Sequence, residues 1–596
     1  MTSRTAERRD GVEHRYQQEV SWGPGVSWGR IPQGRLFRWG IPSLLLICGL
    51  TLLFYRLDQI ALLESGEAKY PLAVLMMKIR DNWIVPFRRG DVWLNKPPLT
   101  MWLIHVTALL GGGIDEWTAR LPSASAALGT VLLVFWWGRR LGGTLFGGIA
   151  GFVLLTSGHF LVMGRTSYPD QVFTFFFTAT LLAFYAVYHG WWDEKAWWVM
   201  YAAMGLATMV KGPIGLLLPI PVMVAYLIIQ KDRGALQRMR WVSGLMIYVA
   251  ITFPWYYGVP LWYGVSALPG IVDMIRPYQA SIRDVPWYIY GLYIVSFPLS
   301  FAPWSLFLPG LYPAWRRYAK EEKGAPDGLR FATVWWLLLF LVFSFAKKKR
   351  AYYLLPLLPA SAVMVAYVCA YLMSIEEQSP KWLHRYLQGV LSTLLALAIG
   401  LMGLLALQGM GLTERLLRVM QPLAASVFLI LLPVCLLLGL RRIRQHRYLP
   451  TFGVLGVGVF SFWLWAIVFY APAWDKDWSA KVVGTSLQKM VPPGTDVWMY
   501  KHQSDSISVY FGRDIRPLTN LDPVGDPVQR KVPVYLLAHE GHIGYIFGRY
   551  PGLFQVCERF YYRKSPVSLV FLTNQRCPPS RKETPRFPTD ASARAP

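Results

Sequence analysis

Charged residues are scarce in this chain. Only 16% of its 596 residues are Asp, Glu, Lys or Arg, whereas soluble domains carry about 25%. Hydrophobic residues make up 54% of the chain, and the mean hydropathy is +0.33. This composition excludes an ordinary soluble protein and indicates a polytopic membrane protein.

Acidic residues are scarcer than basic ones. The chain has 34 Asp and Glu against 60 Lys and Arg, which gives a formal net charge of +26. The basic residues lie largely in short runs between apolar segments, as the positive-inside rule requires. Part of the excess is available to anionic lipid headgroups or phosphates. The charge therefore does not indicate nucleic acid, and we expect no nucleic-acid partner.

Cysteine is also rare, with five residues in all. Cys48, Cys369 and Cys435 lie in apolar runs and are expected to be packing residues. Cys557 and Cys577 share the polar C-terminal region and are able to pair if that region faces an oxidising compartment. The sequence leaves this pairing open. Residues 1–39 are mostly polar and no small-residue cleavage site follows the first apolar run, so we expect no cleavable signal peptide.

About thirteen apolar runs are long enough to be membrane spans. The runs are 41–55, 121–137, 142–163, 171–188, 196–210, 214–229, 241–257, 287–311, 331–345, 353–373, 387–407, 423–440 and 451–470. The odd number places the N-terminus in the cytoplasm and the C-terminal region outside. Arg139-Arg140, the 231–240 loop, Arg316-Arg317 and the basic run 441–447 then all lie in the cytoplasm, which supports the count.

Two segments do not fit this scheme directly. Residues 99–110 are apolar but short, and we interpret them as an interfacial or re-entrant helix of the first outer loop. Lys347–Arg350 places four consecutive basic residues on the outer face, against the positive-inside rule. Either the count is wrong by one nearby or this cluster binds an anion, and we favour the second.

The fold predicted on this basis is an all-α polytopic membrane bundle with a C-terminal α/β extracytoplasmic domain. Residues 1–39 are expected to be a cytoplasmic tail and 40–471 a transmembrane domain with its first outer loop at 57–120. Short strands at 496–500, 532–538 and 567–572 and a helix at 480–490 predict a periplasmic α/β domain over 472–577. The tail 578–596 is rich in Pro, Ser, Arg and Thr and is expected to be disordered.

Three outer segments carry the candidate site residues. Carboxylates beside several cations suit transfer from a lipid phosphate, because cations stabilise the departing phosphate and a carboxylate takes a proton from an acceptor hydroxyl. The candidates are Glu64, Glu67, Lys69, Tyr70 and Lys96 in the first segment, Asp170 in the second, and Lys347, Arg350 and Tyr353 in the third, with Arg276, Tyr278 and Arg283 in the loop before the eighth run.

Each of these has a simpler structural interpretation. Glu67 and Lys69 are also typical of the solvated face of an interfacial helix. Asp170 precedes an apolar run and is a good N-cap residue. Lys96-Pro97-Pro98 is also typical of a rigid turn. Taken singly, these signals are weak.

The order of several short motifs is more specific. Glu67-Ala68-Lys69-Tyr70, Asp81-Asn82-Trp83-Ile84-Val85-Pro86, Asn95-Lys96-Pro97-Pro98-Leu99 and Thr118-Ala119-Arg120-Leu121-Pro122-Ser123 follow one another, and Asp170, Lys211-Gly212-Pro213, Pro303-Trp304-Ser305-Leu306 and the run 353–359 come later. This set resembles the aminoarabinose transferase and protein O-mannosyltransferase group of membrane glycosyltransferases. The resemblance runs from about residue 55 to 370 and implies the GT-C fold and a polyprenyl-phosphate sugar donor.

The resemblance also implies roles for individual residues. Lys69 falls where the family has an Arg near the lipid phosphate, and Lys96 matches its phosphate-binding Lys. Tyr353 matches a pocket Tyr, and Asp170 matches an acidic residue of the second loop. The family's usual catalytic Asp is Gly66 here, its acid before Lys-Pro-Pro is Asn95, and its His of the fourth outer loop is replaced near Tyr278. We therefore expect no metal site built from that acid and His, and no cofactor is evident.

Three explanations of Gly66 follow, in this order of preference. Glu67 or Glu64 supplies the carboxylate, the acceptor is an already ionised phosphate, or transferase activity is lost. The expected function is transfer of a hexosyl or pentosyl group from a polyprenyl phosphate to an envelope acceptor on the periplasmic face of a bacterial inner membrane. Lipid A is the acceptor that the resemblance favours, and protein is its rival. A lipid flippase and a non-catalytic scaffold are the alternatives from other classes.

Overall fold

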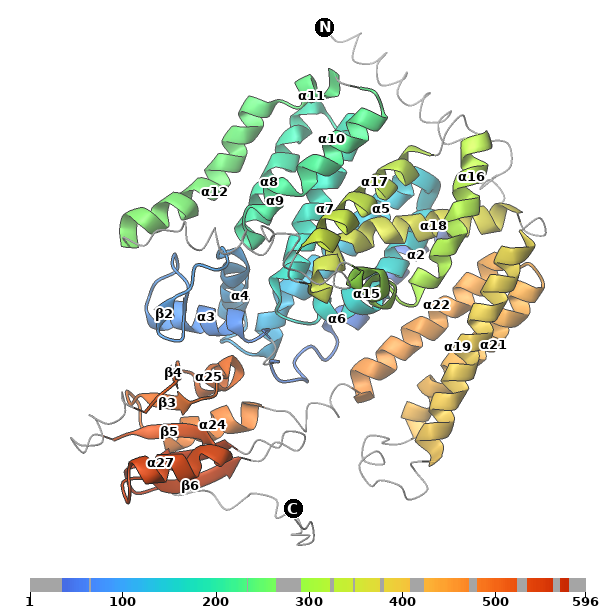
Figure 1. The fold of residues 1–596 in the computed structure, drawn as a ribbon. Coiled ribbons are helices and arrows are strands. Elements are labelled where there is room, and N and C mark those ends of the chain that lie inside the picture. Colours follow the sequence, from blue (N-terminus) through green and yellow to red (C-terminus); the bar gives the residue numbers. More distant parts are fainter. Residues whose placement is uncertain are drawn as a thin grey trace. The chain divides into compact units, whose positions relative to one another are not determined.

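The computed structural model describes most of the chain (Figure 1). The described residues are 35–63, 66–232, 234–263, 291–321, 326–346, 349–375, 380–407, 423–470, 480–521, 533–560 and 569–577. Several predictions lie outside them, namely residues 1–34 of the N-terminal tail, the tail 578–596, and the candidates Glu64, Lys347, Arg276, Tyr278 and Arg283. The chain divides into two compact units. The first comprises Met1–Ile60, Met77–Pro86 and Val92–Trp474, and the second Ala61–Met76, Phe87–Asp91 and Asp475–Pro596.

The first unit is helical. Its helices are α2 (Arg35–Phe54), α4 (Leu99–Leu110), α5 (Glu116–Leu155), α6 (Gly158–Gly164), α7 (Pro169–Tyr188), α8 (Trp197–Lys211), α9 (Ile214–Leu217), α10 (Pro219–Ile229), α11 (Gly234–Arg238), α12 (Trp241–Tyr263), α15 (Leu292–Ser300), α16 (Leu311–Glu321), α17 (Asp327–Phe345), α18 (Leu358–Ile375), α19 (Lys381–Leu407), α21 (Leu423–Arg444) and α22 (Tyr448–Trp465). Short 3-10 segments η2 (Glu194–Ala196), η5 (Trp304–Gly310) and η6 (Ala351–Leu357) and a π-helical turn η9 (Ala466–Tyr470) join them. Helix α3 (Lys69–Ile79) belongs partly to each unit.

Helix α5 is a hairpin of two halves. Its 40 residues would extend about 60 Å as one straight helix, twice the hydrocarbon thickness of about 30 Å. Gly142 and Gly143 leave the helical conformation, and Gly143 has a φ of +85°. A Cβ added at Gly147 would lie 2.5 Å from the carbonyl oxygen of Phe135, so the second half packs back against the first. This turn separates the two runs predicted at 121–137 and 142–163.

Seven helices within the described residues are long and apolar enough to cross a membrane, or eight if Leu292–Ser300 and Trp304–Lys320, bent by 112°, form one span. Both halves of α5 are counted as one helix in that number. The polytopic membrane fold is thereby confirmed, while the count of about thirteen spans stays a prediction. Residues 99–110 form α4, which at 12 residues is too short to span.

Aromatic side chains form the centre of the first unit. Trp137 of α5 packs at 5.6 Å from Tyr185 of α7, at 5.8 Å from Phe331 and at 6.2 Å from Trp335 of α17, measured between ring centroids. All four residues belong to one buried cluster, and α18 is buried along almost its whole length. These contacts fix the relative positions of the helices from which the candidate site residues extend.

The second unit is built on a five-stranded sheet. Its strands are β3 (Val497–Tyr500), β4 (Arg516–Leu518), β5 (Tyr535–His539), β6 (Gln555–Phe560) and β7 (Leu569–Thr573), in the order β4-β3-β5-β7-β6. Strands β4, β3 and β5 are parallel, and β7 is antiparallel to β5 and β6. The predicted strands near 496–500, 532–538 and 567–572 are confirmed as β3, β5 and β7. Strands β4 and β6 escaped prediction because both are short or polar.

Both faces of this sheet are buried, so successive residues of its central strands are hydrophobic and point to opposite faces. Leu537 and Phe571 join a cluster with α24 (Ala480–Met490) and α25 (Asp505–Phe511). Leu536 and Leu572 join a second cluster with Ile546 of α27 (Ile543–Arg549). Helix α24 has the predicted bounds. The Cys557–Cys577 pair, left open by the sequence, forms a disulfide.

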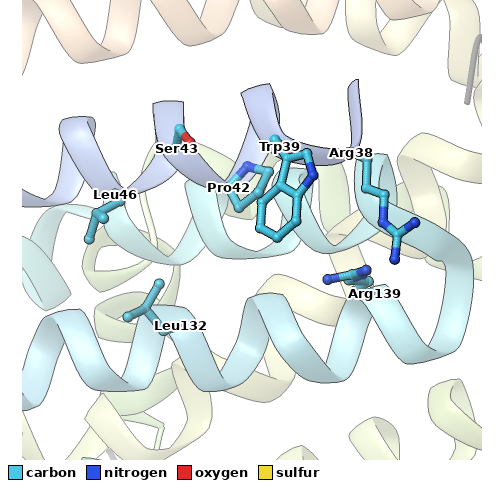
Figure 2. A pocket seen from close by; sticks show the side chains of 7 residues that line it. All are labelled: Arg38, Trp39, Pro42, Ser43, Leu46, Leu132 and Arg139. Atoms are coloured by element: carbon cyan, nitrogen blue, oxygen red, sulfur yellow. The ribbon is translucent and has the colours of Figure 1, made fainter. Parts of the chain in front are cut away.

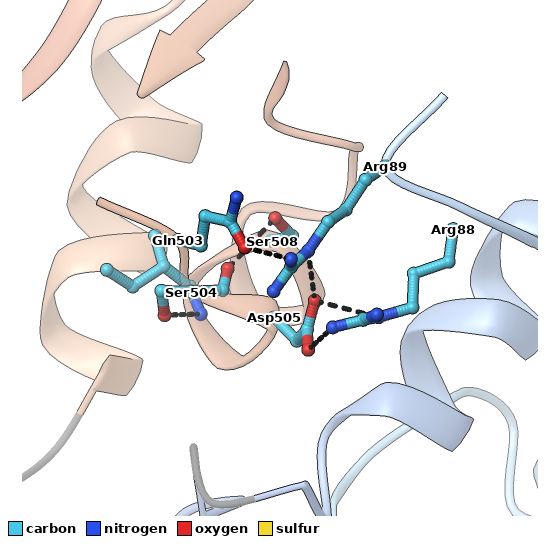
Figure 3. A network of polar contacts seen from close by, with 7 residues as sticks. Arg88, Arg89, Gln503, Ser504, Asp505 and Ser508 are labelled. Atoms are coloured by element: carbon cyan, nitrogen blue, oxygen red, sulfur yellow. Dashed lines mark hydrogen bonds and ion pairs between the residues drawn. The ribbon is translucent and has the colours of Figure 1, made fainter. Parts of the chain in front are cut away.

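Two stretches of the predicted first outer loop belong to this second unit. The backbone N–H of Leu62 donates to the Tyr510 hydroxyl at 2.7 Å, and Ser506 Oγ donates to the Leu62 carbonyl at 2.9 Å. Near the short hairpin β1 (Phe87–Arg88) and β2 (Asp91–Val92), both Arg88 and Arg89 form ion pairs with Asp505 (Figure 3). The C-terminal sheet therefore folds together with segments 400 residues earlier in the chain.

Candidate active site

Asp170 lies at the start of α7. Pro169 occupies the first helical position, where its missing N–H costs nothing, and Tyr168 before it is extended with φ −76° and ψ +143°. Asp170 follows within the first turn and is only 3% exposed. The N-cap is Tyr168 and not Asp170, and the Asp170 carboxylate forms an ion pair instead. The interpretation of Asp170 as an N-cap is therefore wrong.

The partner of Asp170 is Lys211, the last residue of α8. Gly212 and Pro213 end this helix, and a cation in a last turn interacts favourably with the helix dipole. Lys211 Nζ contacts Asp170 Oδ1, and the Lys211 side chain is 6% exposed. Two buried charges are tolerated here because each supplies the other's counter-charge.

Aromatic rings surround the Lys211 ammonium. Its Nζ lies 5.1 Å from the ring centroid of Phe173, 5.1 Å from that of Tyr353 and 5.9 Å from that of Tyr352. Tyr168 packs at 5.7 Å from Tyr352. Aromatic faces attract a cation through their quadrupole, so rings of η6 and of the first turns of α7 stabilise the Lys211 ammonium.

Lys96 belongs to the same electrostatic neighbourhood. It lies in the turn before α4, where it is partly exposed. The pKa of Lys96 is lowered to about 8: desolvation is the largest cause and the positive charge of Lys211 acts in the same direction, while the negative charge of Asp170 opposes both. Lys96, Lys211 and Asp170 therefore form one group with a net charge of +1 when Lys96 is protonated. Such a group is suited to an anion.

Lys349 and Arg350 have structural contacts in the basic cluster 347–350. Lys349 Nζ donates to the Phe343 carbonyl at 2.8 Å and to that of Ser344, which satisfies the end of α17. Desolvation lowers the pKa of Lys349 to about 8. The backbone of Arg350 binds the Tyr293 hydroxyl, while its side chain is exposed. The role of Arg350 in phosphate binding stays a prediction.

Glu67, Lys69 and Tyr70 belong to the second unit. Glu67 is fully buried, and its Oε2 accepts a hydrogen bond from the Leu63 N–H at 2.9 Å. The interpretation of Glu67 as part of a solvated face is therefore wrong. Tyr70 is buried and Lys69, the first residue of α3, is partly exposed. Gly66 before them has a φ of +119°, a conformation that an Asp rarely adopts.

Residues of the first-loop motifs form hydrogen bonds to the backbone of the segments near the site. Asn82 Oδ1 accepts from the N–H groups of Ile84 and Val85, both at 3.1 Å, as in an Asx turn. Arg120 donates to the carbonyls of Leu57 and Ile60 at 2.9 and 2.6 Å. Arg120 thus satisfies backbone groups after the end of α2.

Ser123 of the same motifs forms a hydrogen bond next to the site. Its hydroxyl on α5 donates to the carbonyl of Tyr168 at 3.0 Å, directly before α7. Trp102 Nε1 of α4 donates to the Trp83 carbonyl at 2.7 Å. The helix that follows Lys96 and the helix that carries Asp170 are therefore both held by residues of the first-loop motifs.

Lys211 and Tyr352 were not predicted as site residues. Lys211 was seen only as part of a motif, although a lone lysine between two apolar runs, 196–210 and 214–229, is a signal in itself. An ionisable residue at such a place is a functional candidate by default. In the part of the chain that the structure describes, no three His, Cys, Asp or Glu side chains gather as a metal site requires.

Comparison with protein families matches the central part of the first unit. A family model described as dolichyl-phosphate-mannose-protein mannosyltransferase matches residues 95–257. This segment contains Lys96, Asp170 and Lys211, the charged group of the candidate site.

Two relatives and one solved structure are similar over longer stretches. An uncharacterized protein of Aquifex aeolicus is 29% identical over 326 residues, which are 54% of this chain and 62% of that protein. The chain thus matches less than two thirds of this relative's length. An undecaprenyl phosphate-alpha-4-amino-4-deoxy-L-arabinose arabinosyl transferase of Pseudomonas fluorescens is 26% identical over 75% of this chain and 74% of its own length.

The crystal structure of ArnT from Cupriavidus metallidurans bound to undecaprenyl phosphate superposes with a TM-score of 0.73 and 18% identity. The superposition covers 91% of this chain and 99% of ArnT. At this identity the likeness shows the fold, and the predicted GT-C fold is confirmed.

Proposed function

We propose that this chain, which has the GT-C fold of ArnT, is a membrane glycosyltransferase that takes its sugar from a polyprenyl phosphate. The observation that carries the proposal is the group formed by Lys96, Lys211 and Asp170. It combines the Asp170–Lys211 ion pair with a second cation, Lys96, whose pKa responds to both charges, within the segment that matches the family model. Curated relatives named as undecaprenyl phosphate-aminoarabinose arabinosyl transferases support the same donor class.

The charge change in the reaction explains why two cations are useful. The donor phosphate is a diester with one negative charge, and it leaves as a monoester that gains a second. The bond between the anomeric carbon and the phosphate oxygen breaks, and its electron pair goes to the phosphate. A bond to the acceptor oxygen forms on the opposite face, which inverts the anomeric configuration. Lys96 and Lys211 would stabilise the charge that develops on the phosphate.

Asp170 would act mainly on Lys211. Its carboxylate is paired with the Lys211 ammonium, and rings of Tyr352, Tyr353 and Phe173 enclose the same ammonium. We therefore assign Asp170 to positioning Lys211. An acceptor phosphate, already ionised near neutral pH, would need no strong base. If the acceptor is a hydroxyl, Glu67 or Glu64 is the candidate to take its proton.

The acceptor is proposed to be lipid A or a related envelope lipid at the periplasmic face of the inner membrane. This rests on the arabinosyl transferase relatives and on the outer position that the topology prediction gives to Asp170, Lys211 and residues 347–350. Protein is the second candidate acceptor, because the family model that matches residues 95–257 describes protein mannosyltransferases. Lys69, Lys347, Arg350 and Tyr353 remain proposed contacts of the donor, and Tyr70, Arg276 and Tyr278 proposed pocket residues.

Mass spectrometry of envelope lipids and glycoproteins tests the proposal. A deletion strain would be complemented with the wild-type chain, with Lys96→Gln or with Lys78→Gln, and the amounts of modified lipid and protein in the three strains compared. Lys78 is an exposed lysine of the same predicted loop and is the matched control. We expect Lys96→Gln to lower modification about 100-fold or more, as the loss of one donor to a developing anion does, and Lys78→Gln to leave it unchanged.

The other outcomes separate the alternatives. Loss of a glycan from proteins alone would identify a protein acceptor. An intact set of glycans in both fractions of the deletion strain would contradict the transferase proposal and favour a scaffold. Unchanged turnover in Glu64→Gln, Glu67→Gln and Asp170→Asn would reject a catalytic carboxylate at all three positions.

A further inference from the structure

A groove lies between the first turns of α2 and the hairpin of α5 (Figure 2). Its volume is about 300 Å³. The residues that line it are Arg38, Trp39, Pro42, Ser43 and Leu46 of α2 and Leu132 and Arg139 of α5. Close packing joins the two helices beside it, since Cβ atoms added at Gly148 and Gly151 would meet Ile41 and Leu45.

Two arginines occupy one end of this groove. Arg38 and Arg139 come from different helices, and Figure 2 shows both guanidinium groups at the same end of it. Both side chains are exposed, and no described carboxylate pairs with either. Two neighbouring guanidinium groups repel each other unless an anion lies between them, and their planar donors fit phosphate oxygens.

The other end of the groove is apolar. At 1.5 Å per residue, Leu46 lies about 12 Å from Arg38 along α2, and Leu132 about 10 Å from Arg139 along α5. Both leucines are thus away from the arginine end of the groove. Both helices are candidate membrane spans. Trp39 is 69% exposed beside the arginines, as expected of an aromatic anchor at the membrane interface. The groove therefore passes from the interface into the hydrocarbon region.

This groove is separate from the candidate active site. Ser123, which holds Tyr168 before the Asp170 helix, is on the same half of α5 as Arg139. The two residues are about 24 Å apart along the helix, close to the hydrocarbon thickness of about 30 Å. The groove therefore lies at the opposite leaflet from Asp170 and Lys211. The topology prediction places the groove at the cytoplasmic leaflet and these two residues at the outer one.

We propose that this groove binds an anionic glycerophospholipid of that leaflet. Its phosphodiester lies between Arg38 and Arg139, and one acyl chain lies against Pro42, Leu46 and Leu132. A phosphate at the interface attached to a hydrocarbon chain is the chemistry that matches both ends of the groove. Basic pockets between membrane helices on the cytoplasmic side bind anionic headgroups in this way.

Native mass spectrometry of the purified full chain tests this proposal. The chain would be mixed with phosphatidylglycerol or with phosphatidylethanolamine of the same acyl chains, and bound lipid counted. We expect each of Arg38→Gln and Arg139→Gln to weaken phosphatidylglycerol binding about fivefold, and the double variant roughly twenty-fivefold. Arg140→Gln is the matched control, because Arg140 is next in sequence but lies over the Trp191 ring. It is expected to change binding less than about twofold.

Ser43→Phe separates a lipid from free phosphate. Ser43 lines the groove and is exposed, so the larger ring fills the groove and keeps both arginines. We expect it to lower phosphatidylglycerol binding several-fold, and we expect inorganic phosphate not to displace the lipid. The proposal is overturned if the double variant binds phosphatidylglycerol as wild type does, or if Arg140→Gln weakens binding equally. Displacement by inorganic phosphate, with Ser43→Phe unaffected, would also overturn it.

Discussion

The Asp170–Lys211 pair gives the sharpest prediction about stability. The two side chains are 3% and 6% exposed, and within the described residues neither charge has a second ion-pair partner. Replacing Lys211 by Met removes the cation and leaves the Asp170 carboxylate buried without its partner. Removing one member of a buried pair costs about 3–5 kcal/mol. Because burial here is nearly complete, solvent screening does not reduce this cost. We expect Lys211→Met to destabilise the first unit by about this amount.

The double variant separates the pair's charge from its packing. In Asp170→Asn with Lys211→Met neither charge of the pair remains, so roughly half or more of the lost stability should return. Donor turnover should stay low in both variants, since each lacks the Lys211 cation. Reversible unfolding in mixed detergent micelles measures the first quantity, and transfer of labelled sugar from polyprenyl phosphate the second.

An exposed ion pair of the same unit is the matched control. Arg238 and Asp232 have side chains that are 59% and 33% exposed, and such pairs contribute about 0–1 kcal/mol. Arg238→Met should therefore change stability by less than about 1 kcal/mol. The reasoning is refuted if Lys211→Met is no more destabilising than Arg238→Met, or if the double variant is less stable than Lys211→Met alone.

Three further predictions concern other groups. The pKa of Lys96 is lowered to about 8, so kcat/KM should fall as pH rises through about 8 and the cation is lost; Lys96→Arg should remove this limb in a pH–rate profile, because arginine stays charged. Asp505→Asn should destabilise the second unit by about 3 kcal/mol in thermal unfolding, because it leaves Arg88 and Arg89 without their shared carboxylate. A loss of stability below about 1 kcal/mol would contradict a structural role for these ion pairs. Gly66→Asp should lower stability by about 1–2 kcal/mol at its φ of +119°, and a higher turnover in the same preparation would show that the missing acid limits the reaction.

Much of the helical fold was accessible from sequence because membrane spans are specified by length and apolarity alone. Helix α24 and the short helix α4 have the predicted bounds. The hairpin of α5 was also predicted as two runs, since Arg139 and Arg140 interrupt the apolar pattern before Gly142. What periodicity did not reveal is that residues 61–76 and 87–91 fold with the C-terminal sheet. That association depends on contacts between Leu62 and Tyr510 and between Arg88 and Asp505, which no local pattern encodes.

The candidate site was predictable to a different degree at each residue. Motif order predicts both Asp170 and Lys96; the structure pairs Asp170 with Lys211, and the charge of Lys211 lowers the pKa of Lys96. Glu67 and Lys349 have the charge expected of site residues, yet their polar atoms bind the backbone of a turn and of a helix end. Charge and position in a loop describe both kinds of residue equally well. Only the partner of each charge distinguishes them, and partners come from distant parts of the chain.

The conformation of Gly66 changes the meaning of the missing acid. A single substitution to Asp would be expected to restore the family's pattern if the surrounding backbone were the same. Here the residue has a positive φ, and the next residue, Glu67, is buried and accepts a hydrogen bond from Leu63. The turn itself is therefore built for glycine. This favours an active centre that relies on the cations Lys96 and Lys211 over one that has lost a carboxylate by a single exchange, and it makes an acceptor that is already ionised the more consistent choice.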